Sequence, residues 1–400
     1  MITRNACLAI VLLTLDCLAF AADKTLSLKV AAGKLDRPQT VASCPLPEWV
    51  TAGSWQLRDT DGQSIPLQVI GSRGYFVVRN LKAGQTRSYT LDRAADIVPA
   101  VSIERHGGEL RTLVGGRHAF TYQFEKVPAP ADFGKEFDRG GYIHPVYTPA
   151  GVLVTDDYPP KHKHHHGIFA PWTKTRFEGR TPDFWNMGQK TGTVEPAALG
   201  RIFSGPVVGG FQTSHRFVDL SARPDPKVAL NETWDVLVYG PVGSEDKLSF
   251  IFDIVSTQTC ATDQPLILPR YHYGGMAIRG HRVWDGAPNA TFLTSEGRTR
   301  ADANESRARW CHVGGQVNGR TAGIAMLSHP ANFRFPQPLR VHPTEPYFCF
   351  IPSLLSDWSI EPGRPYVAQY RFVISDGPAD RQMLDALWAD YAQPVEVTVN

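Results

Sequence analysis

Leu248-Ser249-Phe250-Ile251-Phe252-Asp253-Ile254-Val255-Ser256 is the stretch that decides the fold class, because it is the longest run with the alternation of a β-strand. Alternate side chains of a strand point to opposite faces of a sheet. The face with Leu248, Phe250, Phe252 and Ile254 is the more apolar, and we expect it to lie in the core. We expect Asp253, on the other face, to point to solvent unless that face lines a cleft.

Shorter segments of the same type lie on both sides of this run. The candidate strands are residues 121–124, 152–155, 207–211, 233–238, 323–327, 347–351 and 366–374. The 400 residues include 35 glycines and 31 prolines, which interrupt the chain too often for a helical protein. Because no clear repeat accompanies the strands, the pattern favours one large antiparallel β-sandwich in residues 99–400 over a propeller or solenoid.

The preceding region has shorter strands separated by turn signals. Examples of these signals are Asp59-Thr60-Asp61-Gly62 and Lys82-Ala83-Gly84. They predict a small immunoglobulin-like β-sandwich in residues 22–98. One helix is expected near the end of the chain, where Pro378 suits a first helical position and apolar residues follow at three-to-four spacing up to Pro394. The fold class is therefore all-β.

The first residues predict export. Arg4 precedes a largely apolar run, and Ala19-Phe20-Ala21 suits cleavage before Ala22, so we expect a signal peptide at residues 1–21 and a periplasmic or secreted protein. No later stretch is long and apolar enough to span a membrane. The net charge of +2 comes from mixed charges, which gives no indication of a nucleic-acid partner. The remaining cysteines allow either a disulfide or four buried thiols; they are Cys44, Cys260, Cys311 and Cys349.

A histidine loop lies between Tyr158 and Gly167, with the sequence Tyr-Pro-Pro-Lys-His-Lys-His-His-His-Gly. In an extended segment His162, His164 and His166 share one face, whereas a turn brings other pairs together. Neutral imidazoles bind divalent metals, and we consider His162, His164 and His165 as ligands of Zn²⁺ or Ca²⁺. A histidine could instead act as a general acid or base, and the loop could also be a solvated polar segment.

Three further groups of residues have types suited to sugar chemistry. Trp172, Asp183 and Trp185 combine aromatic rings with a carboxylate, as sugar sites do, although the tryptophans also suit a core. The segment 270–282 contains Tyr271 and Tyr273 as candidate phenolic acids or bases, and candidate ligand contacts at His272, Arg279 and Arg282. An arginine there could bind the carboxylate of a uronate, while a strand with exposed basic residues is the alternative. Glu232 is the best-placed acid, but no spacing supports a paired-carboxylate mechanism.

The order of several motifs resembles the bacterial family labelled methane oxygenase PmoA, a domain of unknown function. The motifs are His144-Pro145-Val146-Tyr147-Thr148-Pro149-Ala150-Gly151, then His162-x-His164-His165-x-Gly167, Asp183-Phe184-Trp185 and Tyr273-Gly274-Gly275-Met276-x-x-Arg279. The resemblance implies a large exported sandwich similar to the galactose-mutarotase supersandwich. The resemblance implies that His162, His164 and His165 occupy the histidine positions of the family's motif. His166 stands where the family often has arginine. Methane monooxygenase subunits span membranes several times, so methane chemistry is not expected here.

We expect a carbohydrate-active enzyme, either a hydrolase or a lyase, that acts on glycosides including anionic or keto-sugars. The expected catalytic residues are His164, His165, Glu232, Tyr273 and Arg279. The expected contacts to a carbohydrate or other small molecule are Trp172, Asp183, Trp185, His272 and Arg282. An epimerase related to aldose mutarotases and a noncatalytic sugar-binding or cell-surface protein are the alternatives.

Overall fold

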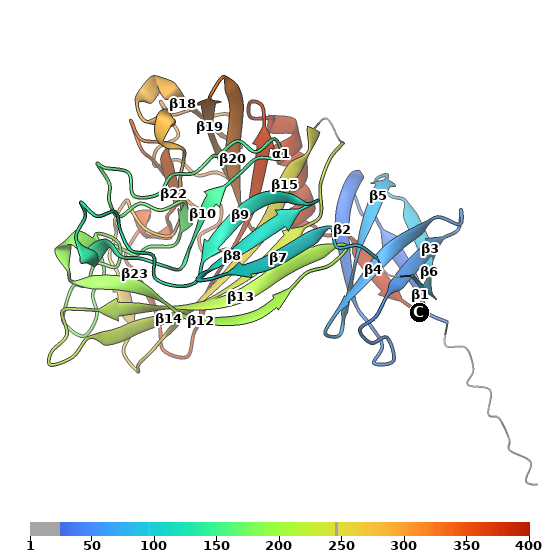
Figure 1. Ribbon diagram of the computed structural model, residues 1–400, viewed down its shortest axis with the longest axis horizontal. Helices are drawn as coiled ribbons and strands as arrows, with labels where there is room; N and C mark the ends of the chain where they lie inside the picture. Colours follow the sequence, from blue (N-terminus) through green and yellow to red (C-terminus); the bar gives the residue numbers. More distant parts are fainter. Residues whose placement is uncertain (1–24, 96, 245–246) are drawn as a thin grey trace, which may run out of the picture.

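The computed structural model describes residues 25–95, 97–244 and 247–400. The predicted signal peptide lies outside these residues and stays a prediction. The described chain is mostly β-strand, with one α-helix among its elements, so the expectation of an all-β sandwich is confirmed (Figure 1). In the part of the chain that is described, no helix has the length and apolar character to cross a membrane.

Two eight-stranded antiparallel sheets form the large sandwich. The first has the order β12 (Gly192–Phe203), β13 (Val208–Asp219), β14 (Lys227–Tyr239), β15 (Ser249–Cys260), β24 (Tyr366–Asp376), β20 (Arg320–Ser328), β19 (Trp310–Val317) and β18 (Ala290–Thr294). The second has the order β21 (Leu339–Val341), β22 (Tyr347–Phe350), β17 (Met276–Arg279), β11 (Ile168–Phe169), β10 (Tyr142–Val146), β9 (Arg117–Gln123), β8 (Glu109–Val114) and β7 (Val101–His106). Apolar side chains of both sheets meet in one core, where Phe120 packs on Phe252 with ring centroids 4.6 Å apart. A two-stranded sheet, β16 (Leu266–Leu268) with β23 (Trp358–Ile360), lies beside them.

The run that predicted the fold forms most of β15, and both of its faces are buried around Asp253. Phe250, Phe252 and Ile254 lie in the core, as expected from their alternation. Asp253 does not point to solvent, because the small sheet and the helix cover the opposite face and leave the residue only 9% exposed. One expected strand is absent among the described residues, because residues 152–155 form isolated bridges instead.

A seven-stranded sheet with its own apolar core precedes the large sandwich (Figure 1). Its order is β2 (Arg37–Pro45), β5 (Arg73–Leu81), β4 (Ser64–Ile70), β3 (Trp55–Asp59), β6 (Thr86–Arg93), β1 (Ser27–Ala31) and β25 (Glu396–Val399). Strand β25 comes from the far end of the sequence and pairs with β1 in antiparallel register. The small sheet is therefore built from both ends of the described chain.

The helix α1 (Arg381–Ala392) joins the two parts of the molecule. Asp380 caps it by accepting a hydrogen bond from the backbone N–H of Met383. The helix therefore starts at Arg381, after Pro378, which the sequence indicates as the first helical position. Its buried side contacts β2: Arg37 forms an ion pair with Asp390, and Thr40 donates to the same carboxylate at 2.9 Å. All four cysteines within the described residues are free, and three of them are buried, whereas Cys260 is partly exposed, so the alternative of four buried thiols holds for three of the four.

Candidate functional site

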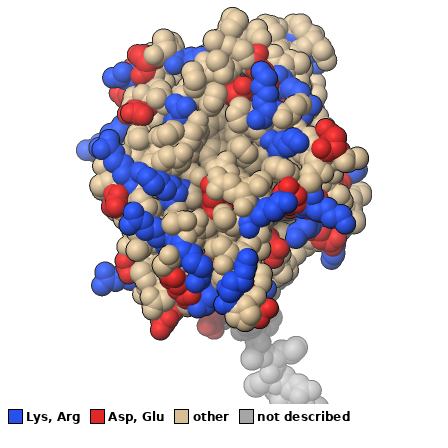
Figure 2. Space-filling view, turned by 90° about the vertical axis from the view of Figure 1, so that its left-hand side faces the viewer, with Lys and Arg blue, Asp and Glu red and all other residues tan. Residues whose placement is uncertain are grey.

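The histidine loop lies at a cavity of about 210 Å³. The lining residues come from four separate loops: His162, His164, His165, Thr173, Trp185, Asn186, Tyr271, Tyr273 and His342. The green loops between β10 and β12 lie at the end of the large sandwich away from the small sheet (Figure 1). Seen from that end, the molecule has a hollow with a mostly uncharged centre, and lysine and arginine side chains lie around it (Figure 2).

The loop is not extended, because two successive turns fold it. The backbone N–H of His162 donates to Pro159 O at 2.9 Å, and that of His165 donates to His162 O at 2.8 Å. The second turn stacks the rings of His162 and His165, with centroids 4.8 Å apart and planes at 15°. His164 meets His165 edge to face at 4.8 Å. Three imidazoles therefore lie together, as the alternative of a turn predicted.

A stack of aromatic rings fixes the inner wall of the cavity. The ring of His165 lies 5.4 Å from that of Trp185 and 4.8 Å from that of Tyr347, nearly parallel to both. Trp185 is anchored to the histidine loop, since its indole N–H donates to His164 O at 3.2 Å. Tyr273 packs against the same indole at 5.1 Å. The predicted residues Trp185 and Tyr273 are thus brought together with the histidines.

Asp183 lies outside the cavity and holds the residues of its wall by hydrogen bonds. Its carboxylate accepts hydrogen bonds from the backbone N–H groups of Trp185 and Asn186, and from the side chains of Thr173 and Asn186, all at 2.8–2.9 Å. The residue is buried and is not among the lining residues. Asp183 therefore orders Trp185 and Asn186, which is a different role from the predicted contact with a sugar hydroxyl.

Burial keeps the imidazoles of the cavity neutral. It lowers the pKa of His164 to about 3, with smaller effects from the neighbouring His162 and His166 and from Arg139. It lowers the pKa of His165 well below the usual value for histidine, and that of His342 to about 4. The pKa of His162 is lowered less, again chiefly by burial. Of the four, His162 is therefore the imidazole best able to take up a proton.

Metal binding by His162, His164 and His165 requires their nitrogen lone pairs to converge on one point. Each lone pair lies in its ring plane, so the parallel stacked rings of His162 and His165 cannot both aim at a common ion. Neutral imidazoles suit Zn²⁺, whereas Ca²⁺ prefers carboxylate oxygens, and none of the described lining residues is Asp or Glu. In the described part of the chain, no group of three His, Cys, Asp or Glu side chains is arranged to hold a metal ion. The residues as arranged do not fit either ion.

His166 faces away from the cavity and forms a pair with Asp157. Its Nδ1 lies 2.6 Å from one carboxylate oxygen of Asp157, and the other oxygen accepts a 2.7 Å hydrogen bond from the hydroxyl of Tyr142. The ring of His166 packs on that of Tyr142, with centroids 4.5 Å apart. These contacts make His166 a support of the loop.

The two predicted arginines are engaged by carboxylates of the chain itself. Arg279 is fully buried and donates to Glu345 at 2.8 Å and to Asp285. Arg282 pairs with Asp156 at 2.9 Å. Neither arginine lines the cavity, and His272 does not line it either, although its ring packs on Tyr273 at 4.6 Å.

Glu232 and Trp172 lie inside the large sandwich instead of at the cavity. The Glu232 carboxylate lies 2.9 Å from His215 Nδ1 and accepts from Ser256 at 2.6 Å and from Gln258 at 2.8 Å. The indole of Trp172 donates to the same Gln258 at 2.7 Å. This closed network is fully buried. The core alternative for Trp172 is thus the one observed.

Several residues of the site carried no recognisable signal in the sequence. His342, Thr173 and Asn186 line the cavity, and Arg340 donates from Nη2 to the hydroxyl oxygen of Tyr273 at 2.9 Å. His342 begins the proline-rich turn His342-Pro343-Thr344-Glu345-Pro346, whose composition alone does not indicate a site. Its place beside His162, with ring centroids 5.7 Å apart, is a property of the folded chain.

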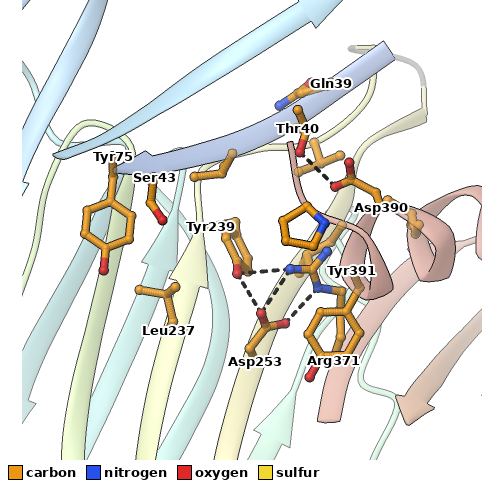
Figure 3. A pocket seen from close by; sticks show the side chains of 15 residues that line it. Gln39, Thr40, Ser43, Tyr75, Leu237, Tyr239, Asp253, Arg371, Asp390 and Tyr391 are labelled. Carbon is orange, nitrogen blue, oxygen red and sulfur yellow. Dashed lines mark hydrogen bonds and ion pairs between the residues drawn. The ribbon is translucent and has the colours of Figure 1, made fainter. Parts of the chain in front are cut away.

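A second cavity of about 210 Å³ lies between the small sheet, the large sandwich and α1 (Figure 3). On its floor Arg371 donates to both oxygens of Asp253, at 2.8 and 3.0 Å, and to the hydroxyl of Tyr239 at 3.0 Å. Tyr239 in turn donates to Asp253 at 2.6 Å. These partners explain how Asp253 is buried at the place where the small sheet, the large sandwich and α1 meet, which we call the junction.

The chain belongs to a family of unknown function, DUF6807, whose model matches residues 109–389. This agrees with the expected domain of unknown function and does not bear on the methane oxygenase label. No curated protein matches the chain. Among solved structures, it is similar to a protein in the glycosyl hydrolase family 38 from Enterococcus faecalis, with 9% identity and a TM-score of 0.41. That match covers 94% of this chain and 47% of the other, so the chain spans about half the length of that relative.

Proposed function

We propose that the cavity beside the histidine loop binds a sugar ring, and that the protein is a carbohydrate-active enzyme that works by proton transfer. The composition of the lining carries this proposal. Four imidazoles and the rings of Trp185, Tyr271 and Tyr273 surround one cavity, together with the amide of Asn186 and the hydroxyl of Thr173. Aromatic faces cover the apolar face of a pyranose, and the amide and hydroxyl can bind its hydroxyl groups.

The reaction class follows from the acids and bases that the lining offers. Among the described residues that line the cavity there is no carboxylate, so the pair of carboxyl groups used by most glycosidases has no support here. Imidazole and phenol groups instead suit the removal of a proton from a carbon next to a carbonyl group. A lyase or epimerase is therefore favoured over a hydrolase within the expected set of enzymes.

His162 and Tyr273 are the residues proposed to move protons. His162 keeps the least depressed pKa of the four imidazoles and takes the proton from carbon. Tyr273 accepts a hydrogen bond from Arg340, which leaves its own hydroxyl proton free to be donated to the substrate oxygen. Trp185 and Tyr271 provide the ring faces. His164 and His165 shape the cavity as neutral groups. The predicted signal peptide remains the reason to propose a periplasmic or secreted location.

Uptake of solvent deuterium tests the proposal directly. The chain from Ala22 onward is incubated in D₂O with a panel of uronates and keto-sugars, and deuterium at carbon is followed by NMR. We expect exchange with wild type and with His106→Gln, an exposed control outside the cavity. We expect His162→Gln to lose it. Exchange that is absent in wild type, or unchanged in His162→Gln, contradicts the proposal.

A noncatalytic sugar-binding protein is the second candidate. The low pKa values of His164 and His165 favour it, because such imidazoles are weak bases. This candidate predicts that sugars bind to wild type and to His162→Gln with similar affinity, that Trp185→Ala weakens binding, and that no protein of the set exchanges deuterium. Calorimetric titration of the same panel separates the two candidates.

A further inference from the structure

His342 is held in one orientation by the turn that follows it. Its Nδ1 accepts hydrogen bonds from the backbone N–H of Glu345 at 3.0 Å and from that of Thr344 at 3.3 Å. Two N–H donors aimed at one nitrogen leave no room for a proton on it. The ring of His342 therefore carries its proton on Nε2 in the neutral state.

The environment keeps this ring neutral. Burial and the nearby Arg340 lower its pKa to about 4, so a second proton is not taken up near neutral pH. A neutral imidazole with a fixed Nε2–H can donate one hydrogen bond and cannot accept one at that nitrogen. His342 also cannot offer a metal the lone pair of Nε2 while Nδ1 faces the two backbone donors.

We propose that His342 donates its Nε2–H to the carbonyl oxygen of the ligand, and that the ligand is therefore a sugar in which one hydroxyl group has been oxidised to a ketone. The inference rests on the proposed function, because it assigns the substrate class of the same cavity. His342 and His162 lie at a centroid distance of 5.7 Å with their planes at 74°, so a donor and a base border the same space.

The uncharged lining decides between a ketone and a uronate. Among the described residues that line the cavity there is no lysine or arginine, and Arg279 behind it is occupied by Glu345 and Asp285. Arg340 does not line the cavity and donates to Asn304, Val341 and Tyr273. A uronate would therefore bring a negative charge into this space without a direct partner in the lining, at a high desolvation cost. A ketone is neutral and needs a hydrogen-bond donor, which His342 supplies.

His162, His342 and Tyr273 together supply the base and the donors that the proton transfer needs. His162 takes a proton from the carbon next to the ketone, the C–H electron pair forms a C=C bond, and the carbonyl π electrons move to oxygen. The resulting enolate oxygen accepts the Nε2–H bond of His342 and the proton of Tyr273. A neutral imidazole is a suitable donor here, because in triosephosphate isomerase a neutral histidine polarises the substrate carbonyl in the same way.

The tautomer of His342 is tested first, without any ligand. Protein labelled with ¹⁵N-histidine is studied by NMR between pH 6 and 8, and the His342 signals are assigned by their absence in His342→Gln. We expect Nε2 to be protonated and Nδ1 to be unprotonated over this whole range. A proton on Nδ1, or titration of the ring within this range, overturns the proposal.

The ligand class is tested by a matched comparison of methyl glucoside, its 2-, 3- and 4-keto derivatives, and glucuronate. Calorimetry should show that wild type binds at least one ketone tenfold more tightly than the parent alcohol, and more tightly than glucuronate. His342→Leu should lose this preference, and His342→Gln, which keeps a donor near the Nε2 position, should retain part of it. Circular dichroism checks that each variant is folded, and Lys29→Gln serves as a distant control.

The outcomes separate this inference from the proposed function. A preference for the ketone that depends on His342, without deuterium exchange in wild type, supports the donor and contradicts the proton-transfer enzyme. Binding of glucuronate in preference to every ketone overturns the inference, as does binding of no ketone. An equal preference for the ketone in wild type and His342→Leu overturns it as well.

Discussion

The two cavities have the same volume, about 210 Å³, but among the described residues only one of them is lined by buried polar atoms that lack hydrogen-bond partners. At the junction, Tyr239, Asp253 and Arg371 satisfy one another. At the histidine loop, the Nδ1 atoms of His162 and His165 are buried and lack hydrogen-bond partners among the described residues. Each buried unsatisfied polar group costs about 1–3 kcal/mol, and a ligand in the cavity that bonds to these nitrogens would remove this cost.

The difference teaches that burial alone does not identify a functional site. Asp253 and Glu232 are deeply buried carboxylates, and both belong to closed networks that hold parts of the protein together. The cavity of the histidine loop combines burial with unpaired nitrogens and an open volume. We therefore expect substitutions in one cavity to change stability and substitutions in the other to change activity.

The largest expected effect is on turnover at the histidine loop. His162→Leu combined with His164→Leu should lower the exchange rate roughly 10²–10⁴-fold, equivalent to about 3–5 kcal/mol in the activation barrier. The free energy of unfolding should change by less than about 1 kcal/mol, because no partner is left unpaired when these rings are replaced by apolar side chains. Exchange rates and urea unfolding of the same samples measure both. A large loss of stability with turnover retained would contradict the contrast between the cavities.

At the junction, Arg371→Met should lower the free energy of unfolding by about 3–5 kcal/mol, because it leaves the Asp253 carboxylate buried without its cation. The double variant Asp253→Leu with Arg371→Met should recover much of this loss, since both charges are then removed. Sugar binding at the histidine loop should be unchanged in both. Urea unfolding measures the stability and calorimetry measures the binding. If the single and double variants lose equal free energies of unfolding, Asp253 and Arg371 do not act as a mutually neutralising pair.

Acidification should weaken the fold through the imidazoles of the histidine loop. The pKa of His164 is lowered to about 3 in the folded chain, so between pH 6.5 and 3 the unfolded chain binds more protons. The free energy of unfolding is therefore unaffected by protonation of His164 above about pH 6.5. It falls as the pH decreases below that value, by at most about 1.4 kcal/mol per pH unit for this group. Urea unfolding at several pH values should show a smaller slope for His164→Phe. A slope equal to that of wild type would show that His164 is not the group responsible.

The smallest effect is expected from metal removal. Because the stacked rings of His162 and His165 do not converge on one point, treatment with a chelator should leave deuterium exchange and the melting temperature unchanged. Elemental analysis of the purified chain should find less than one equivalent of zinc. One equivalent of bound zinc that is lost in His164→Ala would show that the rings rearrange around an ion, and the proposed roles would then change.

Local patterns predicted the strands well, because alternation and turn residues act over a few positions. The nine-residue run became β15, and the spacing after Pro378 became α1. The environment of Asp253 was not predictable in this way, since it depends on β2 and α1, which are far away in the sequence. For the same reason Arg279 seemed free to bind a ligand, until the fold placed Glu345 and Asp285 beside it.

The candidate site was predicted in part. Trp185, Tyr273 and the histidine loop do share one cavity. The histidine loop was recognisable because a cluster of imidazoles is hard to explain by packing. The roles assigned to Asp183, Glu232 and Trp172 were not observed, because hydrogen-bond partners decide such roles and the sequence does not specify them. His342 was missed because a single histidine in a turn carries no signal until the structure shows its neighbours.

The pairing of β1 with β25 has a consequence for biosynthesis. Ser27 and Asn400 exchange backbone hydrogen bonds at 3.2 and 2.9 Å, so the edge of β1 is covered by a strand that the ribosome makes after the whole large sandwich. During translation this edge stays open, and an open strand edge is a template for unwanted pairing with another chain. The nascent small sheet should therefore depend on chaperones more than the large sandwich does, until β25 has been synthesised.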